Sequence, residues 1–470
     1  MIIVRRAFDR ASIAELPEDD AASLQRKLAL AARLHADRSQ WLPPHERMGI
    51  LRRLVPLLEG KRVHLARQIS LEGGKPLVDA LVEVDRAVDG VRNAVDVMRT
   101  EGGHEIPMGL TAASADRRAF TFHEPIGVVV AISAFNHPLN LIVHQVVPAV
   151  AVGCPVIVKP APATPLSCLE LADLLEQAGL PEGWCQVFLS SDTALAEALA
   201  TDRRVAFLSF IGSARVGWHL RSKLPPGTRC ALEHGGAAPC IVDRSADLGR
   251  LLEPLAKGSY YHAGQVCVST QRIFVHRSLR DDFLERFAAR VLALRTGDPA
   301  LEETELGPLI SPEEATRVEQ WIGEAVASGA TLVGGGRLSP TTLRPSILVE
   351  PPPDAKVSSL EVFGPTTCVH AFDDLGQAIA AANGLPTAFQ ASIFTNDLNA
   401  ALHAAERLDA SAVMVNDHTA FRTDWMPFAG RRESGYGTGG IPWTMRDMSS
   451  RKMVVFRTGW QSACMRDDAR

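Results

Sequence analysis

The pattern of apolar and polar residues divides the chain into regions of different character. From about residue 23 to residue 99, apolar residues recur every three or four positions, which predicts amphipathic helices. Gly73–Pro76 interrupts this period and predicts a loop between two helices. From 109 to 122 the helical period is lost, and the alternation at 120–122 predicts an extended strand or a hairpin.

From residue 127 onward, short apolar runs rich in β-branched residues alternate with helical segments. We predict strands at 128–132, 156–159, 186–189 and 205–210, with helices at 141–152, 165–177 and 193–199 between them. Continuous apolar runs suit strands that are buried on both faces. This region therefore predicts a parallel, doubly wound sheet whose ligand site lies at the carboxyl ends of its strands.

A second α/β series begins near residue 240. Its predicted strands are 240–242, 272–275 and 412–415, and its predicted helices are 248–257, 279–293 and 312–328. A chain of 470 residues is too long for one compact core, so we expect two or three domains.

The run from Leu141 to Val158 is long and apolar enough to resemble a membrane span. Two prolines and the break at Gly153–Pro155 divide it, which favours a buried helix followed by a buried strand. The net charge of −5 gives no reason to expect nucleic acid or an anionic membrane as a partner. The eight cysteines show no paired or metal-binding spacing, so we expect free thiols, no metal and a reducing cytoplasmic location. Met1–Arg6 lacks the features of a secretory signal.

The candidate chemistry lies in two short segments. Cys267 stands among small residues in Gly264–Ser269, where a thiol is accessible, and a thiol needs a base to become a nucleophile near neutral pH. Glu233, in the glycine-flanked segment Leu232–Gly236, would serve as that base if burial raised its pKa. Taken alone, such a cysteine is more often an inert core residue, and such a glutamate a surface charge. The two are 34 residues apart, so only a tertiary fold would bring them together.

Leu-Glu-x-Gly-Gly followed by Gly-Gln-x-Cys resembles the aldehyde dehydrogenase superfamily. Further segments resemble motifs of this family in the same order across essentially the whole chain: Asn136, Lys159-Pro160, Phe210–Ser213, Glu361–Pro365 and Phe428–Gly435. The resemblance implies an α/β fold with a Rossmann-like cofactor domain (1–108 and 127–233), a second α/β catalytic domain (234–428) and a small β oligomerisation ribbon (109–126 and 441–463). It also implies a homodimer or homotetramer.

The resemblance implies a mechanism through a covalent thioester. Cys267 would attack an aldehyde, Asn136 and the Cys267 backbone N–H would stabilise the oxyanion, and Glu233 would activate the hydrolytic water. Relatives that transfer the acyl group to coenzyme A often lack the glutamate, so Glu233 favours release of a carboxylate.

The cofactor implied is NAD or NADP. Pro162 stands where many NAD-preferring members have a glutamate, which leaves NADP open. The G-x-G-x-x-G match at Gly435–Gly440 follows no predicted strand, so we reject it as a dinucleotide site. The residues that the resemblance assigns to the cofactor are Ile132, Ser133, Lys159, Gly212, Ser213, Val216, Glu361 and Phe363.

Arg86, His137 and Arg422 fall roughly where relatives acting on phosphorylated or phosphonylated aldehydes bind the anion. Those relatives are phosphonoacetaldehyde dehydrogenase and non-phosphorylating glyceraldehyde-3-phosphate dehydrogenase, several of which have an arginine where this chain has Val266. A small phosphono, phospho or sulfo aldehyde is therefore one expected substrate. The alternatives are that the arginines are structural ion-pair partners and His137 a turn residue, and that the substrate is a semialdehyde or a neutral aliphatic aldehyde. An inactive cofactor-binding relative is a further alternative, against which the intact set of Asn136, Glu233 and Cys267 argues.

Overall fold

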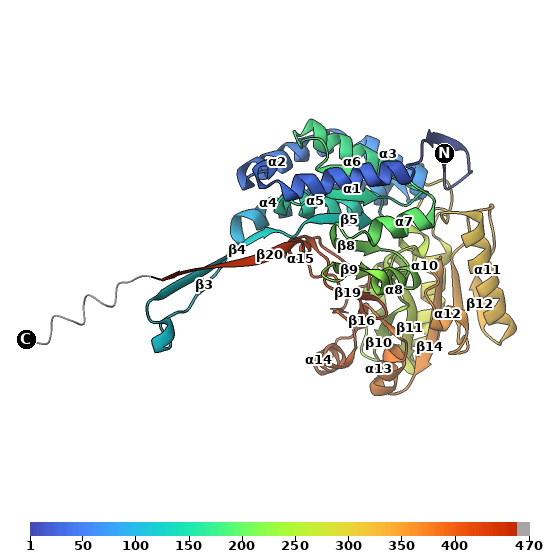
Figure 1. Cartoon of the computed structure of the whole chain (residues 1–470). Helices are drawn as coiled ribbons and strands as arrows, with labels where there is room; N and C mark the ends of the chain where they lie inside the picture. Colours follow the sequence, from blue (N-terminus) through green and yellow to red (C-terminus); the bar gives the residue numbers. More distant parts are fainter. Residues whose placement is uncertain (458–470) are drawn as a thin grey trace, which may run out of the picture.

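A computed structural model of the chain describes residues 1–457. Its body contains two α/β units, and an antiparallel sheet projects from it (Figure 1). The strands of the first unit run in the order β19-β9-β8-β5-β6-β7, and β5 to β9 are parallel. Their bounds are β5 (Val128–Ile132), β6 (Val156–Lys159), β7 (Cys185–Val187), β8 (Val205–Ile211), β9 (Arg229–Glu233) and β19 (Gly435–Tyr436). β19 is antiparallel to β9.

Helices cover both faces of this first sheet. On β5, Val129 and Ala131 pack in the core with α2, α4, α5 and α6, whereas Val128 and Val130 pack in the core with α1. Because successive strand residues point to opposite faces, this confirms the doubly wound arrangement. The helices are α1 (Ala21–Ala36), α2 (Pro44–Gly60), α3 (Arg62–Gly73), α4 (Leu77–Thr100), α5 (Asn140–Val152), α6 (Leu166–Gln177), α7 (Thr193–Ala200) and α8 (Ala214–Lys223).

The second sheet has the order β12-β13-β14-β11-β10-β16-β17, and its strands are parallel except for the β12–β13 pair. The strands are β10 (Ala238–Val242), β11 (Thr270–His276), β12 (Thr331–Gly334), β13 (Ser346–Val349), β14 (Thr366–Phe372), β16 (Gln390–Phe394) and β17 (Ala412–Val415). The accompanying helices are α9 (Leu248–Tyr260), α10 (Arg280–Leu292), α11 (Pro312–Ala327), α12 (Lys356–Ser359), α13 (Leu375–Asn383) and α14 (Leu398–Arg407).

The projecting sheet consists of β3 (Glu105–Ile106), β4 (Arg117–Pro125) and β20 (Ser449–Arg457). β20 pairs with β4 along its whole length, and the two strands extend away from the body (Figure 1). The extended segment predicted for 109–122 begins only at Arg117, because 110–116 form a loop with a short 3₁₀ turn. Of the segment 441–463, α15 (Ile441–Asp447) is a helix packed on α4 and α5, and 458–463 lie outside the described residues.

Several short elements were not anticipated from the sequence pattern. An N-terminal hairpin pairs β1 (Ile2–Arg5) with β2 (Ser12–Leu16), and β15 (Thr387–Ala388) pairs with β18 (Arg431–Arg432). The strand β9 was also missed, although it positions Glu233 at its carboxyl end. Leu141 to Val158 forms part of α5 followed by β6, as predicted. Within residues 1–457, no helix is both long and apolar enough to cross a membrane.

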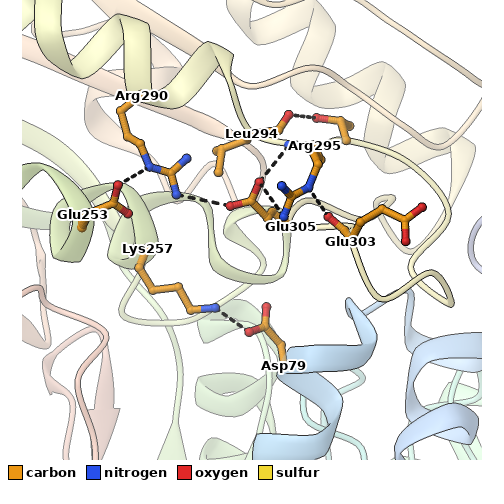
Figure 2. A network of polar contacts seen from close by, with 9 residues as sticks. Asp79, Glu253, Lys257, Arg290, Leu294, Arg295, Glu303 and Glu305 are labelled. Atoms are coloured by element: carbon orange, nitrogen blue, oxygen red, sulfur yellow. Dashed lines mark hydrogen bonds and ion pairs between the residues drawn. The ribbon is translucent and has the colours of Figure 1, made fainter.

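An ion pair connects the two α/β units near the site. Lys257 on α9 binds Asp79 on α4, and Figure 2 shows the adjoining network, in which Arg290 of α10 donates to Glu253 of α9 at 2.6 Å. Arg290 also donates to Glu305 at 3.3 Å. These contacts fix α9 between α10 and α4, and α9 leads directly into the loop that carries Cys267.

Candidate active site

The loop that presents Cys267 has a constrained backbone. After α9 ends at Tyr260, His262, Ala263 and Gly264 adopt positive φ values of 49°, 55° and 71°. A Cβ on Gly264 would overlap the carbonyl of Gly364, so this position requires glycine. The loop thus turns sharply and places the partly buried Cys267 against an apolar cluster that includes Phe389 and Phe428.

Asn136 lies beside the Cys267 loop. It follows β5, is 4 % exposed, and its Nδ2 donates to the carbonyl of Gln265 at 2.9 Å. The Gln265 side chain donates to the carbonyl of Pro308 at 3.2 Å and accepts from the N–H of Ile310 at 2.9 Å. Because an amide nitrogen carries two hydrogens, Asn136 keeps a second N–H while it holds this loop.

Glu233 ends β9, and its charge acts on the Cys267 thiol. Its carboxylate lies against Gly439, where a Cβ would overlap Glu233 Oε1. Burial raises the pKa of Glu233, and the charge of Arg422 opposes this shift. Burial also raises the pKa of the Cys267 thiol to about 12, with further increases from Glu361 and Glu233 and an opposing effect of Arg422. In this state the thiol is protonated, so a nearby base must accept its proton.

Glu361 also acts on the Cys267 thiol through its charge, and Phe363 follows it two positions later. The Glu361 carboxyl packs against Gly235, where a Cβ would overlap its Oε1, and this buried oxygen has no hydrogen-bond partner. Burial raises the pKa of Glu361 to about 8. Phe363 has a positive φ of 49° and meets Phe135 edge to face, with ring centroids 5.8 Å apart.

Other residues assigned to the cofactor gather at the carboxyl ends of β5, β6 and β8. Ile132 ends β5, and the next residue, Ser133, has a buried Oγ without a partner. The Ser133 N–H donates to the carbonyl of Lys159 at 3.0 Å. Burial lowers the pKa of the Lys159 ammonium, while Glu18 opposes the shift.

The turn into α8 continues this cradle. Ser213 is the N-cap of α8 but makes no side-chain cap hydrogen bond, and Val216 on the first turn is 36 % exposed. A Cβ on Gly212 would come within 2.8 Å of the Phe210 ring. Free hydroxyls and a helix N-terminus suit a pyrophosphate, and the unpartnered Glu361 oxygen suits a ribose hydroxyl. The residues present therefore fit a dinucleotide.

Arg86 is held by a buried carboxylate. Its Nη2 and Nε donate to Asp424 at 2.8 and 3.1 Å, and Asp424 is 1 % exposed. Asp424 also accepts from Asn140 Nδ2 at 3.1 Å and from His144 Nε2 at 2.7 Å. This is the ion pair that the sequence left open for Arg86, and it makes Arg86 a structural partner of α5 and the loop around Asp424.

Arg422 differs from Arg86 in its contacts. Its guanidinium carbon lies 3.6 Å from the centroid of the Phe428 ring, and its Nη2 lies 3.4 Å from His144 Nδ1. Its buried Nε has no partner, and within residues 1–457 no carboxylate forms a hydrogen bond with it. Its charge acts on both Cys267 and Glu233, so it lies at the site.

His137 lies near Arg422 and Arg86, whose charges act on it. It is 8 % exposed, and its Nε2 is 3.4 Å from the hydroxyl of Tyr261. Burial, followed by the charges of Lys75 and Arg86, holds the pKa of His137 well below its usual value. His137 is therefore a neutral hydrogen-bonding group at neutral pH.

The structure adds residues that sequence reasoning missed, namely Asn140, His144 and Asp424. Asp424 stands only two positions after Arg422, but nothing in the sequence marks its pairing with Arg86, 338 residues away. The candidate set Asn136, Cys267, Glu233 and Arg422 is brought together, and Arg86 and His137 border it through Asp424 and Tyr261.

Comparison with known proteins shows the family of the chain. The family model described as "Aldehyde dehydrogenase family" matches residues 2–454. The 3-sulfolactaldehyde dehydrogenase of Priestia aryabhattai is 36 % identical over 88 % of this chain and 86 % of its own length. The structure of aldehyde dehydrogenase 21 from Physcomitrella patens with the product succinate has a TM-score of 0.94, 33 % identity, and coverage of 98 % of this chain and 95 % of that one. A glyceraldehyde-3-phosphate dehydrogenase from Methanocaldococcus jannaschii complexed with NADP has a TM-score of 0.93, 32 % identity, and coverage of 97 % and 99 %. The chain belongs to the aldehyde dehydrogenase family.

Proposed function

We propose that the protein oxidises a small anionic aldehyde to a carboxylate, with NAD or NADP, through a thioester on Cys267. The observation that carries this proposal is that the Cys267 thiol lies close enough to Glu233 for the carboxylate charge to raise its pKa, next to Asn136, which binds the Cys267 loop. When bound, the nicotinamide cofactor supplies the acceptor for the hydride of the aldehyde.

The residues of this chain divide the remaining chemistry. Glu233 takes the proton of Cys267 directly or through water, because burial raises the pKa of this carboxyl toward the range useful for a base. The Cys267 sulfur then bonds to the aldehyde carbon. The free N–H of Asn136 and the backbone N–H of Cys267 stabilise the negative oxygen that results.

Hydrolysis regenerates the thiol. Glu233 accepts a proton from the attacking water, the carbon–sulfur bond breaks, and the carboxylate is released. Before this step Glu233 releases the proton of Cys267 to solvent, and afterwards the proton taken from water returns to the thiolate. The net change consumes one aldehyde and one water and yields one carboxylic acid, one hydride transferred to the cofactor and one proton released to solvent. The acid then ionises. Glu233 therefore acts in both half-reactions.

The anionic substrate is supported by Arg422, whose buried Nε lacks a partner at the site. The relatives named above act on sulfolactaldehyde, yield succinate or act on glyceraldehyde 3-phosphate, as their names state. Three further residues support the proposal less directly: Arg86, His137 and the exposed Pro162. Arg86 and His137 border the anion end through Asp424 and Tyr261, and Pro162 leaves room for the 2′-phosphate of NADP.

The test combines an aldehyde panel with two variants. Wild-type protein should reduce NAD or NADP with charged aldehydes, whereas Cys267→Ala should bind the cofactor without turnover. Glu233→Gln should lower steady-state turnover by about 10²- to 10⁴-fold. Full activity of Cys267→Ala would refute the proposed nucleophile.

A further inference from the structure

We propose that Asp424 and His144 position Arg422 as the one cation, among the described residues at the aldehyde site, that is not hydrogen-bonded to a carboxylate, so that the site selects aldehydes with one negative charge over those with two. This inference rests on the proposed function and names the charge of its substrate. Arg86, already paired with Asp424, is not assigned to the substrate.

Most cations around the site are paired with carboxylates. Arg86 is neutralised by its two hydrogen bonds to Asp424, and Lys75 is paired with Glu83 with neither side chain exposed. Lys257 on α9 is paired with Asp79. Among the described residues of this region, Arg422 is the cation that has only a ring and an imidazole as contacts.

Asp424 and His144 set the orientation of Arg422. Asp424 accepts hydrogen bonds from Arg86 and Asn140, and an ionised carboxylate has no hydrogen to donate to His144. His144 Nε2 must therefore carry the hydrogen of the 2.7 Å bond to Asp424. His144 Nδ1 is then a lone pair, which accepts from Arg422 Nη2 at 3.4 Å.

The imidazole remains neutral in this arrangement. Burial and the nearby Arg422 lower the pKa of His144 to about 4, although Asp424 opposes the shift. A charged His144 would donate from both nitrogens and would repel Arg422. Neutral His144 and the Phe428 face thus define the plane of the guanidinium from two sides.

The charge balance also bears on the ligand. A sulfonate or carboxylate carries one charge at neutral pH, and the guanidinium fork can bind two oxygens of either group. A phosphate monoester carries nearly two, since its second pKa is about 6. A phosphonate loses its second proton at a somewhat higher pH and carries most of its second charge at about pH 8. The second charge would face Glu233 or Asp424 without a cation of its own, because Arg86 is already engaged.

The experiment compares kcat/KM for four aldehydes of different charge. They are neutral lactaldehyde, singly charged succinate semialdehyde and sulfoacetaldehyde, and doubly charged phosphonoacetaldehyde. At about pH 8, wild-type protein should prefer the single charges over the double charge by about 10-fold or more. To compare pH values, kcat/KM for each aldehyde is divided by kcat/KM for sulfoacetaldehyde at the same pH. The preference over phosphonoacetaldehyde, measured in this way, should shrink toward pH 6 because the phosphonate gains a proton. The titratable and charged groups around Arg422 are Glu233, Asp424, Arg86, Cys267, His137 and His144, and this ratio cancels their common effect on the chemistry.

Variants of Arg422 and His144 separate anion binding from help to the thiol. Arg422→Met should reduce kcat/KM for the singly charged aldehydes at least 30-fold more than for lactaldehyde, mainly through KM. His144→Leu should reduce kcat/KM for the singly charged aldehydes about 10-fold more than for lactaldehyde. His144→Asn, which offers an oxygen near the place of Nδ1, should restore most of this loss. The matched control is Arg277→Met, an exposed arginine paired with Asp373.

Asp424→Asn tests the charge balance from the other direction. It removes the charge that cancels Arg86, so phosphonoacetaldehyde should gain at least about 5-fold relative to sulfoacetaldehyde. If this variant fails to fold, the His144 pair decides the question, with cofactor binding and thermal unfolding as folding checks. Equal losses for charged and neutral aldehydes in Arg422→Met would show that Arg422 serves the thiol and would overturn the inference, while the thioester chemistry would stand. A wild-type protein that oxidises none of the four aldehydes would overturn both.

Discussion

At the scale of single residues, the thiol of Cys267 is harder to ionise than a free cysteine. Burial raises its pKa to about 12, and Glu361 contributes more to the increase than Glu233 does. Many catalytic cysteines instead have a lowered pKa. In the proposed mechanism the site therefore depends on proton transfer to Glu233 when substrate is present, and we expect the resting thiol to have low reactivity.

Alkylation by iodoacetamide should show this low reactivity. The rate at Cys267 without substrate should still rise above about pH 9, where a free cysteine of pKa about 8.5 has levelled off. Glu361→Gln should increase the rate above about pH 8, because the wild-type carboxyl, with a pKa of about 8, is charged there. Mass spectrometry of the modified Cys267 peptide measures the alkylation rate. A plateau near pH 8 would contradict the raised pKa.

Gly439 gives a second prediction at this scale. In Gly439→Ala the new Cβ would overlap Glu233 Oε1, which is the flexible end of a side chain, so the base must move while the fold is kept. We expect kcat to fall by about 10- to 100-fold, part of the loss expected for removal of a general base.

Gly323→Ala is the control for this variant, because a Cβ there meets nothing within 4 Å on helix α11. It should keep full activity and gain up to about 1 kcal/mol of stability. Steady-state kinetics and thermal unfolding measure both effects. An active Gly439→Ala would show that the Glu233 position seen here is not the catalytic one.

Residue motifs allowed much of the candidate site to be predicted. Cys267, Glu233 and Asn136 stand in short segments whose neighbours are characteristic. Asp424 and His144 could not be predicted, because their roles come from hydrogen bonds across 280 residues or more and from burial that the loop sequence does not show. The sequence also could not decide whether Arg86 was an ion-pair partner, since its carboxylate lies in a distant segment.

At the scale of elements, strands buried on both faces were the easiest to predict. β5 and β8 read as apolar runs because helices cover both sides of each. β9 was missed because it begins with Arg229 and ends with Glu233, so it lacks such a run. The pairing of β1 with β2 was missed for another reason, since β2 has no fully buried residue and therefore shows no apolar run.

Glu72, which caps the start of helix α6, makes the stability of the fold depend on pH. Glu72 is fully buried and accepts hydrogen bonds from the N–H groups of Leu166 and Ser167 at 2.8 and 3.0 Å. Burial raises its pKa from 4.5 to about 7. The folded state therefore binds this proton more tightly than the unfolded state does, and stability is lost as pH rises from about 4.5 through about 7.

The variant Glu72→Gln should flatten this dependence. In the wild-type protein the shift in the Glu72 pKa changes the free energy of unfolding by up to about 3 kcal/mol across this pH range, at 1.36 kcal/mol per pKa unit. Glutamine also loses one accepting oxygen near Leu166, so the slope of stability against pH is informative and the absolute stability is not. Urea unfolding at several values between about pH 5 and 8 measures the slope. Equal slopes for both proteins would argue against a raised Glu72 pKa.

At the scale of the whole molecule, the site depends on how the two α/β units meet. Asn136 comes from the first sheet and Cys267 from the second unit, and their loops are joined by the bond from Asn136 to the Gln265 carbonyl. The Lys257–Asp79 pair holds α9 against α4 nearby. The two successive α/β patterns predicted both units, but their mutual orientation depends on such long-range contacts and could not be read from the sequence.

The projecting sheet gives the prediction that concerns assembly. β20 is an edge strand of nine residues, and several apolar side chains on β20 and β4 are about half exposed: Phe120 43 %, Met453 53 %, Val455 44 % and Phe456 51 %. A long edge strand with exposed apolar residues is a surface for pairing with another chain. We therefore expect a homo-oligomer in which this sheet contacts a second copy.

Charged substitutions on β20 test this expectation. Val455→Asp with Phe456→Asp should shift the protein to a smaller species in light scattering, because two charges would be buried at the interface without partners. Leu398→Asp on α14 is the control: its leucine is 71 % exposed on the body of the molecule, and an aspartate is favourable in the first turn of a helix. The control should keep the wild-type mass. An unchanged mass for the β20 variant, at concentrations from about 0.1 to 10 μM, would exclude these two side chains from the contact, and a monomeric wild type would remove the predicted role of the sheet.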